Sequence, residues 1–425
     1  MFPYPQIVRQ SFFALEAHKD KVESLKSPYE TGLWITARDE PGGVTRHESD
    51  RTYGHYTFYT SGHTSGAFLR DMEGNLMHEW RLPFGQAWSD PPHVDNPPPE
   101  SLIYWRRAHL YRNGDVLALY STVAGSPYGY GLVKIDRDSE VLWRYPEHVH
   151  HDFDLTDEGT IYTLVHKNRS TAKRPVPGVP QYPPLILEEY LVELSPGGHE
   201  RNRINLLELL AESKYRHLLQ MYDPRKTNPV RGREPWDIMH ANGVEIVGDQ
   251  FAEAHEFVDA GDVLVSFRAL DTIIAVDIDR EAVTWASRGF WRAQHDPDAL
   301  ANGDLLVFDN RGDTVRGGRS RILQFDPTSR AASWRYRGTA DEPFDSERLG
   351  SQQVLPNGNL LITSSAEGRL LEVTPRGRIV WEYKNRVEFP NGDSAYRPVT
   401  FGATRFSKLE LLFEFDGQTT EAGGQ

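Results

Sequence analysis

The feature that most constrains this chain is a tryptophan that recurs at a regular spacing. Trp285, Trp334 and Trp381 each end a short strand-like run, and they are 49 and 47 residues apart. Trp80 and Trp143 occupy similar contexts earlier in the chain. A period of about 40–50 residues is typical of architectures in which every repeat is one small unit. We therefore interpret the 425 residues as stacked repeats and not as two or three ordinary domains.

A tight turn that contains glycine recurs with the same period. Glycine adopts the positive φ of a hairpin turn without strain, and asparagine adopts it at low cost. Such turns occur at Asn113-Gly114, Glu158-Gly159, Ala260-Gly261, Asn302-Gly303 and Asn357-Gly358, and a degenerate copy precedes residues 56–59. The chain therefore contains six repeat units, one of which lacks the tryptophan.

The fifth unit shows the anatomy of a repeat most clearly. Strand-like runs cover residues 295–300, 304–308, 321–325 and 332–336. Their apolar and polar residues alternate, as in half-buried strands. One four-stranded sheet cannot bury both of its faces, whereas six sheets packed around an axis can. The sequence thus predicts an all-β fold, a six-bladed β-propeller of four-stranded blades, with a β-solenoid as the competing architecture.

Three segments do not follow the repeat. Residues 5–27 form an amphipathic pattern and are expected to be a helical arm that packs on the protein or makes a homodimer contact. The stretches 167–188 and 205–236 are expected to be loop and helix insertions within repeat units, placed to cover a site. The predicted organisation is an N-terminal arm and lead-in at 1–50, a propeller at 51–405, and a C-terminal strand with a disordered tail at 406–425.

Composition excludes several functions. The net charge of −14 repels nucleic-acid phosphates, so no nucleic-acid partner is expected. The absence of cysteine excludes disulfides, thiolate metal sites and cysteine nucleophiles. No apolar run approaches the roughly 18–20 residues of a membrane span, and no secretion signal is evident. A cytoplasmic protein without a membrane span is the expectation.

Polar residues are predicted to gather at one end of the blades. The start of an inner strand and the end of the strand that returns after the turn lie at the same end of a blade. Counting from the turn glycines, these positions include His151, His240, His295, Arg106, Arg268 and Asn310. Such a cup suits a compact anion, because arginine and histidine supply directed donors. A neutral histidine is also a competent nucleophile toward sulfur or phosphorus.

Other interpretations of the same residues remain open at this point. The repeated His-Asp pairs at 151–152 and 295–296 are also consistent with a structural role, and Arg106 with an ordinary salt bridge. Three histidines can also hold a transition metal. His109, His148, His150 and His255 are expected to be surface or packing residues.

Several motifs resemble the arylsulfotransferase family. They are YTFY at 56–59, GAFLRDMEGN at 66–75, HHDF at 150–153, DIMHANGV at 237–244, SFR at 266–268, QHD at 294–296, LLVFDN at 305–310 and LPNGNLLI at 355–362. The resemblance covers roughly residues 54–385 and implies a six-bladed propeller. It also implies transfer of a sulfuryl group from a phenolic sulfate ester to a phenol or another hydroxyl, without a nucleotide sulfate donor or any other cofactor.

The resemblance also assigns roles to residues. His295 matches the transiently sulfated histidine, and His151, His240 and Arg268 match the residues that hold the sulfate, with Asn242 beside them. Asn310 and Arg106 are expected to help bind the substrate. The periplasmic enzymes of the family carry a secretion signal, a disulfide and an added N-terminal β-domain, and none is evident in this sequence. The chain therefore resembles a divergent branch of the family.

Two alternatives to a sulfotransferase are retained. One is a metal-dependent propeller enzyme, a lyase or an oxygenase, with His151, His240 and His295 as ligands. The other is a non-catalytic propeller that uses the cup as an anion or ligand site. Bound metal, or tight ligand binding without turnover, would distinguish them from the transferase.

Overall fold

A computed structural model describes residues 26–37, 40–123, 128–171, 176, 185–221, 237–388 and 395–415. The chain is mostly β, and its contacts divide it into two units. The first unit holds the described residues within 128–131 and 145–348. The second unit holds those within 26–123, 132–144 and 349–415. Each unit is described by itself.

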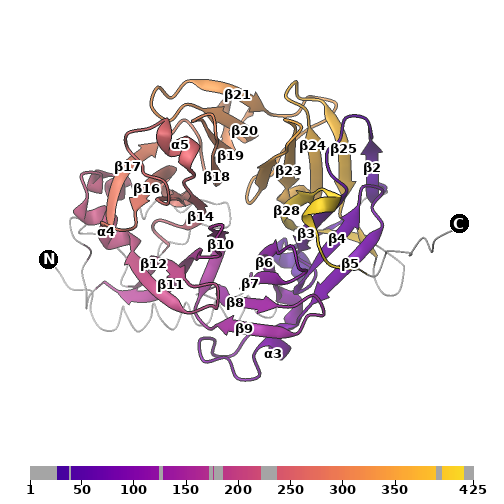
Figure 1. The fold of residues 1–425 in the computed structure, drawn as a ribbon, viewed down its shortest axis with the longest axis horizontal. Helices are drawn as coiled ribbons and strands as arrows, with labels where there is room; N and C mark the ends of the chain where they lie inside the picture. The colour runs from indigo at the N-terminus through magenta and orange to yellow at the C-terminus, as the bar shows by residue number, and fades with distance from the viewer. Residues whose placement is uncertain are drawn as a thin grey trace, which may run out of the picture. The chain divides into compact units, whose positions relative to one another are not determined.

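The first unit consists of three four-stranded antiparallel sheets (Figure 1). They comprise β10 (Val149–Leu155), β11 (Ile161–Ser170), β12 (Leu185–Leu194) and β13 (Glu200–Asn205); β14 (Ala241–Ile246), β15 (Val263–Phe267), β16 (Thr272–Asp277) and β17 (Ala282–Arg288); and β18 (His295–Ala299), β19 (Leu305–Asp313), β20 (Arg319–Phe325) and β21 (Ala332–Tyr336). The innermost strands are neighbours, because β10 contacts β14 and β14 contacts β18. The three sheets therefore pack as successive blades.

The second unit has the same organisation. Its sheets comprise β6 (Ile103–Leu110), β7 (Val116–Thr122), β8 (Gly129–Ile135, which begins in the first unit) and β9 (Val141–Tyr145); β28 (Thr400–Phe406), β3 (Tyr56–Ser61), β4 (Gly66–Asp71) and β5 (Leu76–Arg81); and β22 (Ser351–Val354), β23 (Leu360–Ser364), β24 (Arg369–Val373) and β25 (Ile379–Lys384), with β2 (Gly43–His47) on its outer edge. Strand β28 supplies the inner strand of a sheet whose other strands come from the beginning of the chain. Sequence-distant segments thus close this sheet.

Smaller elements complete the described chain. A three-stranded sheet contains β1 (Trp34–Thr36), β27 (Ala395–Pro398) and β26 (Val387–Glu388). The α-helices are α2 (Pro28–Thr31), α3 (Phe84–Ala87), α4 (Leu206–Glu212) and α5 (Asp249–Glu253), and the 3-10 helices are η1 (Glu100–Leu102), η2 (Arg216–Met221), η3 (Arg268–Leu270), η4 (Thr314–Arg316), η5 (Ser365–Glu367) and η6 (Lys408–Glu410). Among the described residues, no helix is both long and apolar enough to cross a bilayer.

The repeat signals in the sequence correspond to fixed places in the sheets. The five turn glycines all have positive φ, between 82° and 91°. The five recurring tryptophans all lie in the outermost strand of the four, in β5, β9, β17, β21 and β25. The indole of Trp80 donates to the carbonyl of Gly114, the turn glycine of the neighbouring sheet, at 3.0 Å. At Trp80 a recurring tryptophan therefore meets a recurring turn glycine, and the bond joins two neighbouring sheets.

Carboxylates join the innermost strands of the first unit. Asp154 of β10 accepts a hydrogen bond from the backbone N–H of Ile246 in β14 at 2.8 Å. Glu245 of β14 accepts one from Ala299 in β18 at 3.1 Å. An inner strand has one edge without a sheet neighbour, so its amides need other acceptors. The acidic residues of these strands supply them.

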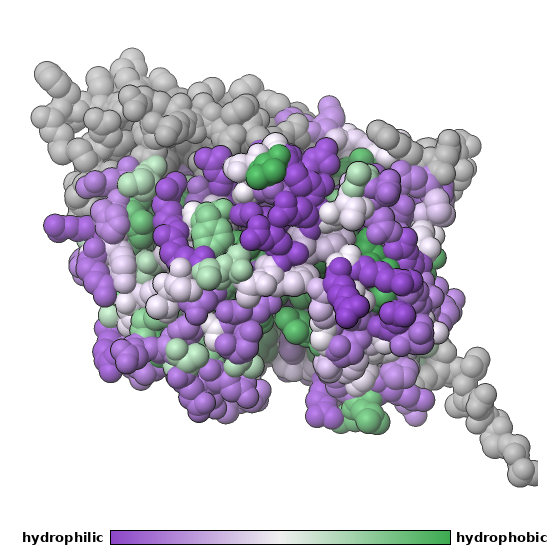
Figure 2. All heavy atoms as spheres, turned by 90° about the horizontal axis from the view of Figure 1, so that it is seen from above, coloured by the Kyte–Doolittle hydropathy of each residue, from purple (hydrophilic) through white to green (hydrophobic). Residues whose placement is uncertain are grey.

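The core lies between neighbouring sheets. In the first unit, Leu164, Leu191, Val244 and Phe267 are almost fully buried in a cluster that also includes α4. At about 25 cal/mol per Å² of apolar area, such burial is the dominant stabilising contribution. Figure 2 shows a face of the protein on which hydrophilic residues predominate and apolar groups are scattered.

The structure confirms the predicted β class and the four-stranded antiparallel sheets. The two ends of the segment 167–188, which was predicted to be a loop, are strand, because β11 continues to Ser170 and β12 begins at Leu185. Within 205–236, α4 and η2 occupy the helical run. Residues 5–25 of the predicted helix and the tail from 416 onward lie outside the described residues. The number of blades and their arrangement about one axis remain predictions.

Candidate active site

The innermost strands of the first unit begin with β-bulges. The pairing register shifts after His150 in β10, after Ala241 in β14 and after His295 in β18. His151 and His240 have positive φ values of 61° and 54°. A bulge changes the direction in which side chains point. A non-glycine residue with left-handed backbone conformation costs of order 1–3 kcal/mol, and such residues cluster at functional sites. The chain therefore departs from regular strand geometry at the histidines.

His295 is held in one orientation by an asparagine. It is 4% exposed, and its Nδ1 lies 2.7 Å from Oδ1 of Asn310 at the end of the returning strand β19. The Asn310 Nδ2 donates to the Ser346 carbonyl at 2.7 Å, which fixes the orientation of the amide. Because an amide oxygen only accepts, His295 Nδ1 carries the hydrogen. The neutral imidazole then has its lone pair on Nε2, where a nucleophile needs it.

His240 forms a pair with a buried aspartate. Its Nδ1 is hydrogen-bonded to Oδ2 of Asp237, which lies three residues earlier and is 4% exposed. The backbone carbonyl of His240 accepts a hydrogen bond from Arg268 N–H at 3.0 Å. A carboxylate on Nδ1 orients the ring and stabilises its protonated form, which leaves Nε2 to exchange protons. This arrangement suits a general acid and base.

His151 lies beside His240 and is supported by a second histidine. The ring centroids of His151 and His240 are 4.8 Å apart. The Nδ1 atoms of His151 and His150 are 2.9 Å apart, so one donates to the other. His150 is fully buried and stacks on His166, with ring centroids 4.2 Å apart. His150 is thus a packing residue, as expected, and its hydrogen bond also orients His151.

A tyrosine packs against this group of histidines. The Tyr128 ring is 5.3 Å from His151, 4.6 Å from His166 and 6.3 Å from His240, centroid to centroid. Burial lowers the pKa of His166 well below its ordinary value, and the nearby His150 acts in the same direction. His166 is therefore neutral, and its ring packs against Tyr128 beside the other histidines.

The remaining predicted residues lie in different places. Arg268 is 5% exposed, at the beginning of η3. Asn242 is buried and donates to the carbonyl of Gln294, directly before His295, at 2.7 Å. Arg106 belongs to the second unit, where its guanidinium lies 5.3 Å from the centre of the Phe401 ring. In the first unit, His240 contacts His151 through its ring and Arg268 through its backbone, and Asn242 is bonded to the residue directly before the strand of His295.

Sequence analysis missed two acids in this site. Asp237 lies three residues before His240, a spacing that signals a local Asp–His pair. Glu189 of β12 is 1% exposed, and its Oε1 accepts a hydrogen bond from Ala241 N–H at 2.8 Å. Burial, and then the charge of Asp237, raise the pKa of Glu189 well above its ordinary value. No local pattern identifies Glu189, since it reaches the site from another sheet.

The three-histidine metal site has no geometric support. Among the residues that the structure describes, no three histidine, aspartate or glutamate side chains are arranged to hold a metal ion. His240 and His295 each use Nδ1 on a protein acceptor. The arrangement instead consists of an oriented imidazole at His295, an Asp–His pair at 237 and 240, and a buried arginine at 268.

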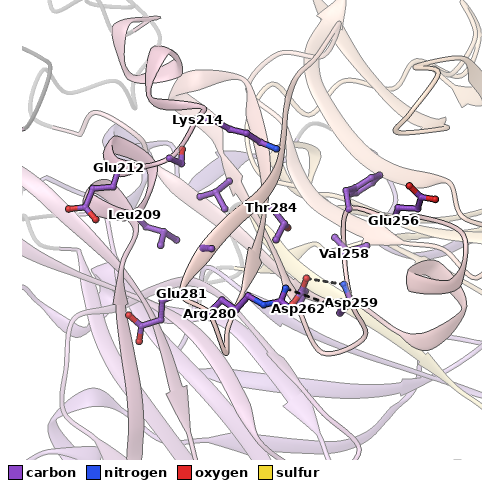
Figure 3. Close-up of a pocket in the computed structure, with 14 residues that line it drawn as sticks. Leu209, Glu212, Lys214, Glu256, Val258, Asp259, Asp262, Arg280, Glu281 and Thr284 are labelled. Atoms are coloured by element: carbon purple, nitrogen blue, oxygen red, sulfur yellow. Dashed lines mark hydrogen bonds and ion pairs between the residues drawn. The ribbon is translucent and has the colours of Figure 1, made fainter.

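A separate pocket of about 630 Å³ lies at the end of the β14–β17 sheet that is away from His240. Its lining includes the segment 256–259 and the turn 280–284, with Lys214 and Glu212 from the α4 region (Figure 3). Strand β14 begins directly after His240, and its partner β15 ends directly before Arg268. The histidine cluster therefore lies at the opposite end of this sheet. The pocket is therefore distinct from the histidine cluster.

One comparison with known proteins identifies a family for this chain. The sequence profile described as arylsulfotransferase matches residues 107–386. No curated protein matches the chain. Similar solved structures include a protein of unknown function from Bacteroides caccae (13% identity, 78% of this chain and 94% of that chain, TM-score 0.46), a streptogramin B lyase (11%, 86% and 93%, 0.41) and the WD40 β-propeller domain of Doa1 (9%, 89% and 99%, 0.42). At these identities and TM-scores, the structural similarities indicate nothing about activity.

Proposed function

Because the chain belongs to the arylsulfotransferase family, we propose that it transfers a sulfuryl group from a phenolic sulfate ester to a phenolic or other hydroxyl acceptor through a sulfohistidine at His295. The observation that carries the proposal is the pair of hydrogen bonds at Asn310, which supports an Nε2 lone pair on a buried histidine. A nucleotide sulfate donor is not required.

The first half of the proposed reaction sulfurylates the enzyme. His295 Nε2 forms a bond to sulfur while the bond between sulfur and the phenolic oxygen breaks. The phenolate leaves with a proton from His240, whose protonated form Asp237 stabilises. In the second half, the acceptor hydroxyl gives its proton to His240 and its oxygen attacks sulfur. The N–S bond then breaks, and His295 returns to its neutral form.

Charge stabilisation falls to the groups around the two histidines. Sulfuryl transfer resembles phosphoryl transfer, in which positioning and cationic donors supply most of the catalysis. Arg268 is always charged and meets the His240 segment through its backbone, and His151 lies beside His240. We assign both to the oxygens of the sulfuryl group. The proposed setting is a six-bladed propeller, supported by five four-stranded sheets and one five-stranded sheet among the described residues and by the family resemblance.

The direct test is the mass of the intact protein after brief exposure to p-nitrophenyl sulfate, with released nitrophenolate read in the same sample. We expect a gain of one sulfuryl group that a phenol removes. His295→Ala should abolish both the adduct and turnover. The matched control is His255→Ala, since His255 is a half-buried histidine that bonds Gly303 away from the cluster. Undiminished sulfuryl transfer by His295→Ala would show that His295 is not the nucleophile.

A further inference from the structure

Two buried carboxyl groups meet adjacent residues at the beginning of β14. Asp237 bonds the side chain of His240, and Glu189 bonds the backbone N–H of the next residue, Ala241. The two acids come from different parts of the first unit, and their hydrogen-bond partners are adjacent in the chain. The carboxyls are therefore held behind the same histidine.

Each carboxyl uses one oxygen and leaves the other buried. Asp237 Oδ1 and Glu189 Oε2 are both inaccessible to solvent, and neither has a hydrogen-bond partner among the described residues. A buried acceptor of this kind costs about 1–3 kcal/mol when it remains without a partner. Two ionised carboxylates at one buried place cost more, because like charges disfavour one another where water is excluded.

One proton resolves both difficulties. If it resides on Glu189 Oε2, that oxygen becomes a donor, and Asp237 Oδ1 becomes its natural acceptor. The hydrogen bond from a carboxylic acid to a carboxylate is short and strong. Burial and the charge of Asp237 raise the pKa of Glu189 in agreement with this arrangement. Asp237 is the better carboxylate of the two, since its other oxygen already bonds His240.

We propose that Glu189 and Asp237 share one proton, with Glu189 Oε2 as donor and Asp237 Oδ1 as acceptor, and that Glu189 is a positioning residue for His240. The acid pair then presents one negative charge to the imidazole. Glu189 also fixes the backbone directly after His240, whose φ of 54° is strained. The consequence for turnover rests on the proposed function, whereas the shared proton does not.

Infrared difference spectroscopy tests the proton directly. Glu189→Gln keeps the shape of the side chain, its acceptor for Ala241 and a donor for Asp237, so the variant should fold. The wild-type-minus-variant spectrum at neutral pH should contain the carbonyl band of a protonated carboxylic acid. Glu188→Gln is the matched control, because Glu188 is a buried neighbour that is ionised against Arg169 at 2.6 Å. Its difference spectrum should lack that band.

The role of Glu189 is tested through His240. Glu189→Gln mimics the protonated acid, so the His240 pKa followed by nitrogen NMR should match that of the wild type. Glu189→Ala should shift the His240 pKa. An acid band missing from the Glu189→Gln difference spectrum would overturn the proposal, even in a protein that shows no sulfuryl transfer. A wild-type protein with the band but without transfer would overturn only the proposed function.

Discussion

Removal of the Asn310 side chain should slow the formation of the sulfohistidine. In Asn310→Ala, His295 loses the acceptor that holds the hydrogen on Nδ1, so this bond no longer favours the tautomer with its lone pair on Nε2. The lost hydrogen bond alone is worth about 0.5–1.5 kcal/mol, or about 2- to 13-fold in rate. A wrong histidine tautomer costs up to about 10⁴-fold in a comparable His-dependent enzyme. We therefore expect the first turnover to be slower by at least about tenfold.

The assay is the burst of nitrophenolate from p-nitrophenyl sulfate in a stopped-flow instrument, which isolates the attack by His295. Stability is measured separately by urea unfolding, because the variant also leaves the Ser346 carbonyl without its donor. Each buried group left without a partner lowers the free energy of unfolding by about 1–3 kcal/mol. Asn310→Asp keeps an acceptor for Nδ1 and should recover most of the burst rate while remaining destabilised.

The control is an asparagine with similar bonds in the other unit. Asn359 is 5% exposed and donates to Arg51 O and Glu372 Oε1, each at 2.8 Å. Asn359→Ala should lower stability without changing the burst rate. A burst rate in Asn310→Ala within about twofold of wild type, less than 0.5 kcal/mol of activation free energy, would refute the tautomer argument.

Three further predictions follow from buried charges. Asp237→Asn should lower kcat by about 10²–10⁴-fold in steady-state assays, with little change in KM, because His240 loses its orienting carboxylate. Burial, and then the charge of Asp154, raise the pKa of Glu245 well above its ordinary 4.5. Because its folded-state pKa exceeds the unfolded one, stability is lost as the pH rises from 4.5 toward the folded-state pKa, and the thermal unfolding of Glu245→Gln should vary less with pH above 4.5 than that of the wild type. Arg169→Met should lower the free energy of unfolding, measured in urea, by about 3–5 kcal/mol, because Glu188 is left charged and buried without its ion-pair partner. An unchanged urea midpoint of unfolding would contradict this.

Local patterns in the sequence were sufficient for the repeat and for part of the site. The turn glycines have the positive φ values that their contexts predicted. Counting from Gly303 placed His295 and Asn310 at the same end of a blade, and the two side chains are 2.7 Å apart. This count works because a tight turn fixes the register of the two strands that it joins.

The sequence did not reveal what supports the histidines. The positive φ values of His151 and His240 leave no signature in the strand alternation. His150 was expected to be a surface or packing residue, and its hydrogen bond to His151 was not predicted. Arg106, selected by the same count as His295, belongs to the other unit and contacts Phe401.

The sequence by itself determined the β class, the four-stranded repeat, the chemical types of the candidate residues and the family, because these depend on turn residues, strand periodicity and short motifs. Only the tertiary structure decided which nitrogen of His295 carries the hydrogen, which acid lies behind His240, and that Glu189 arrives from a different sheet. Protonation and orientation depend on burial and on neighbours distant in the sequence. These arise only when the sheets pack together.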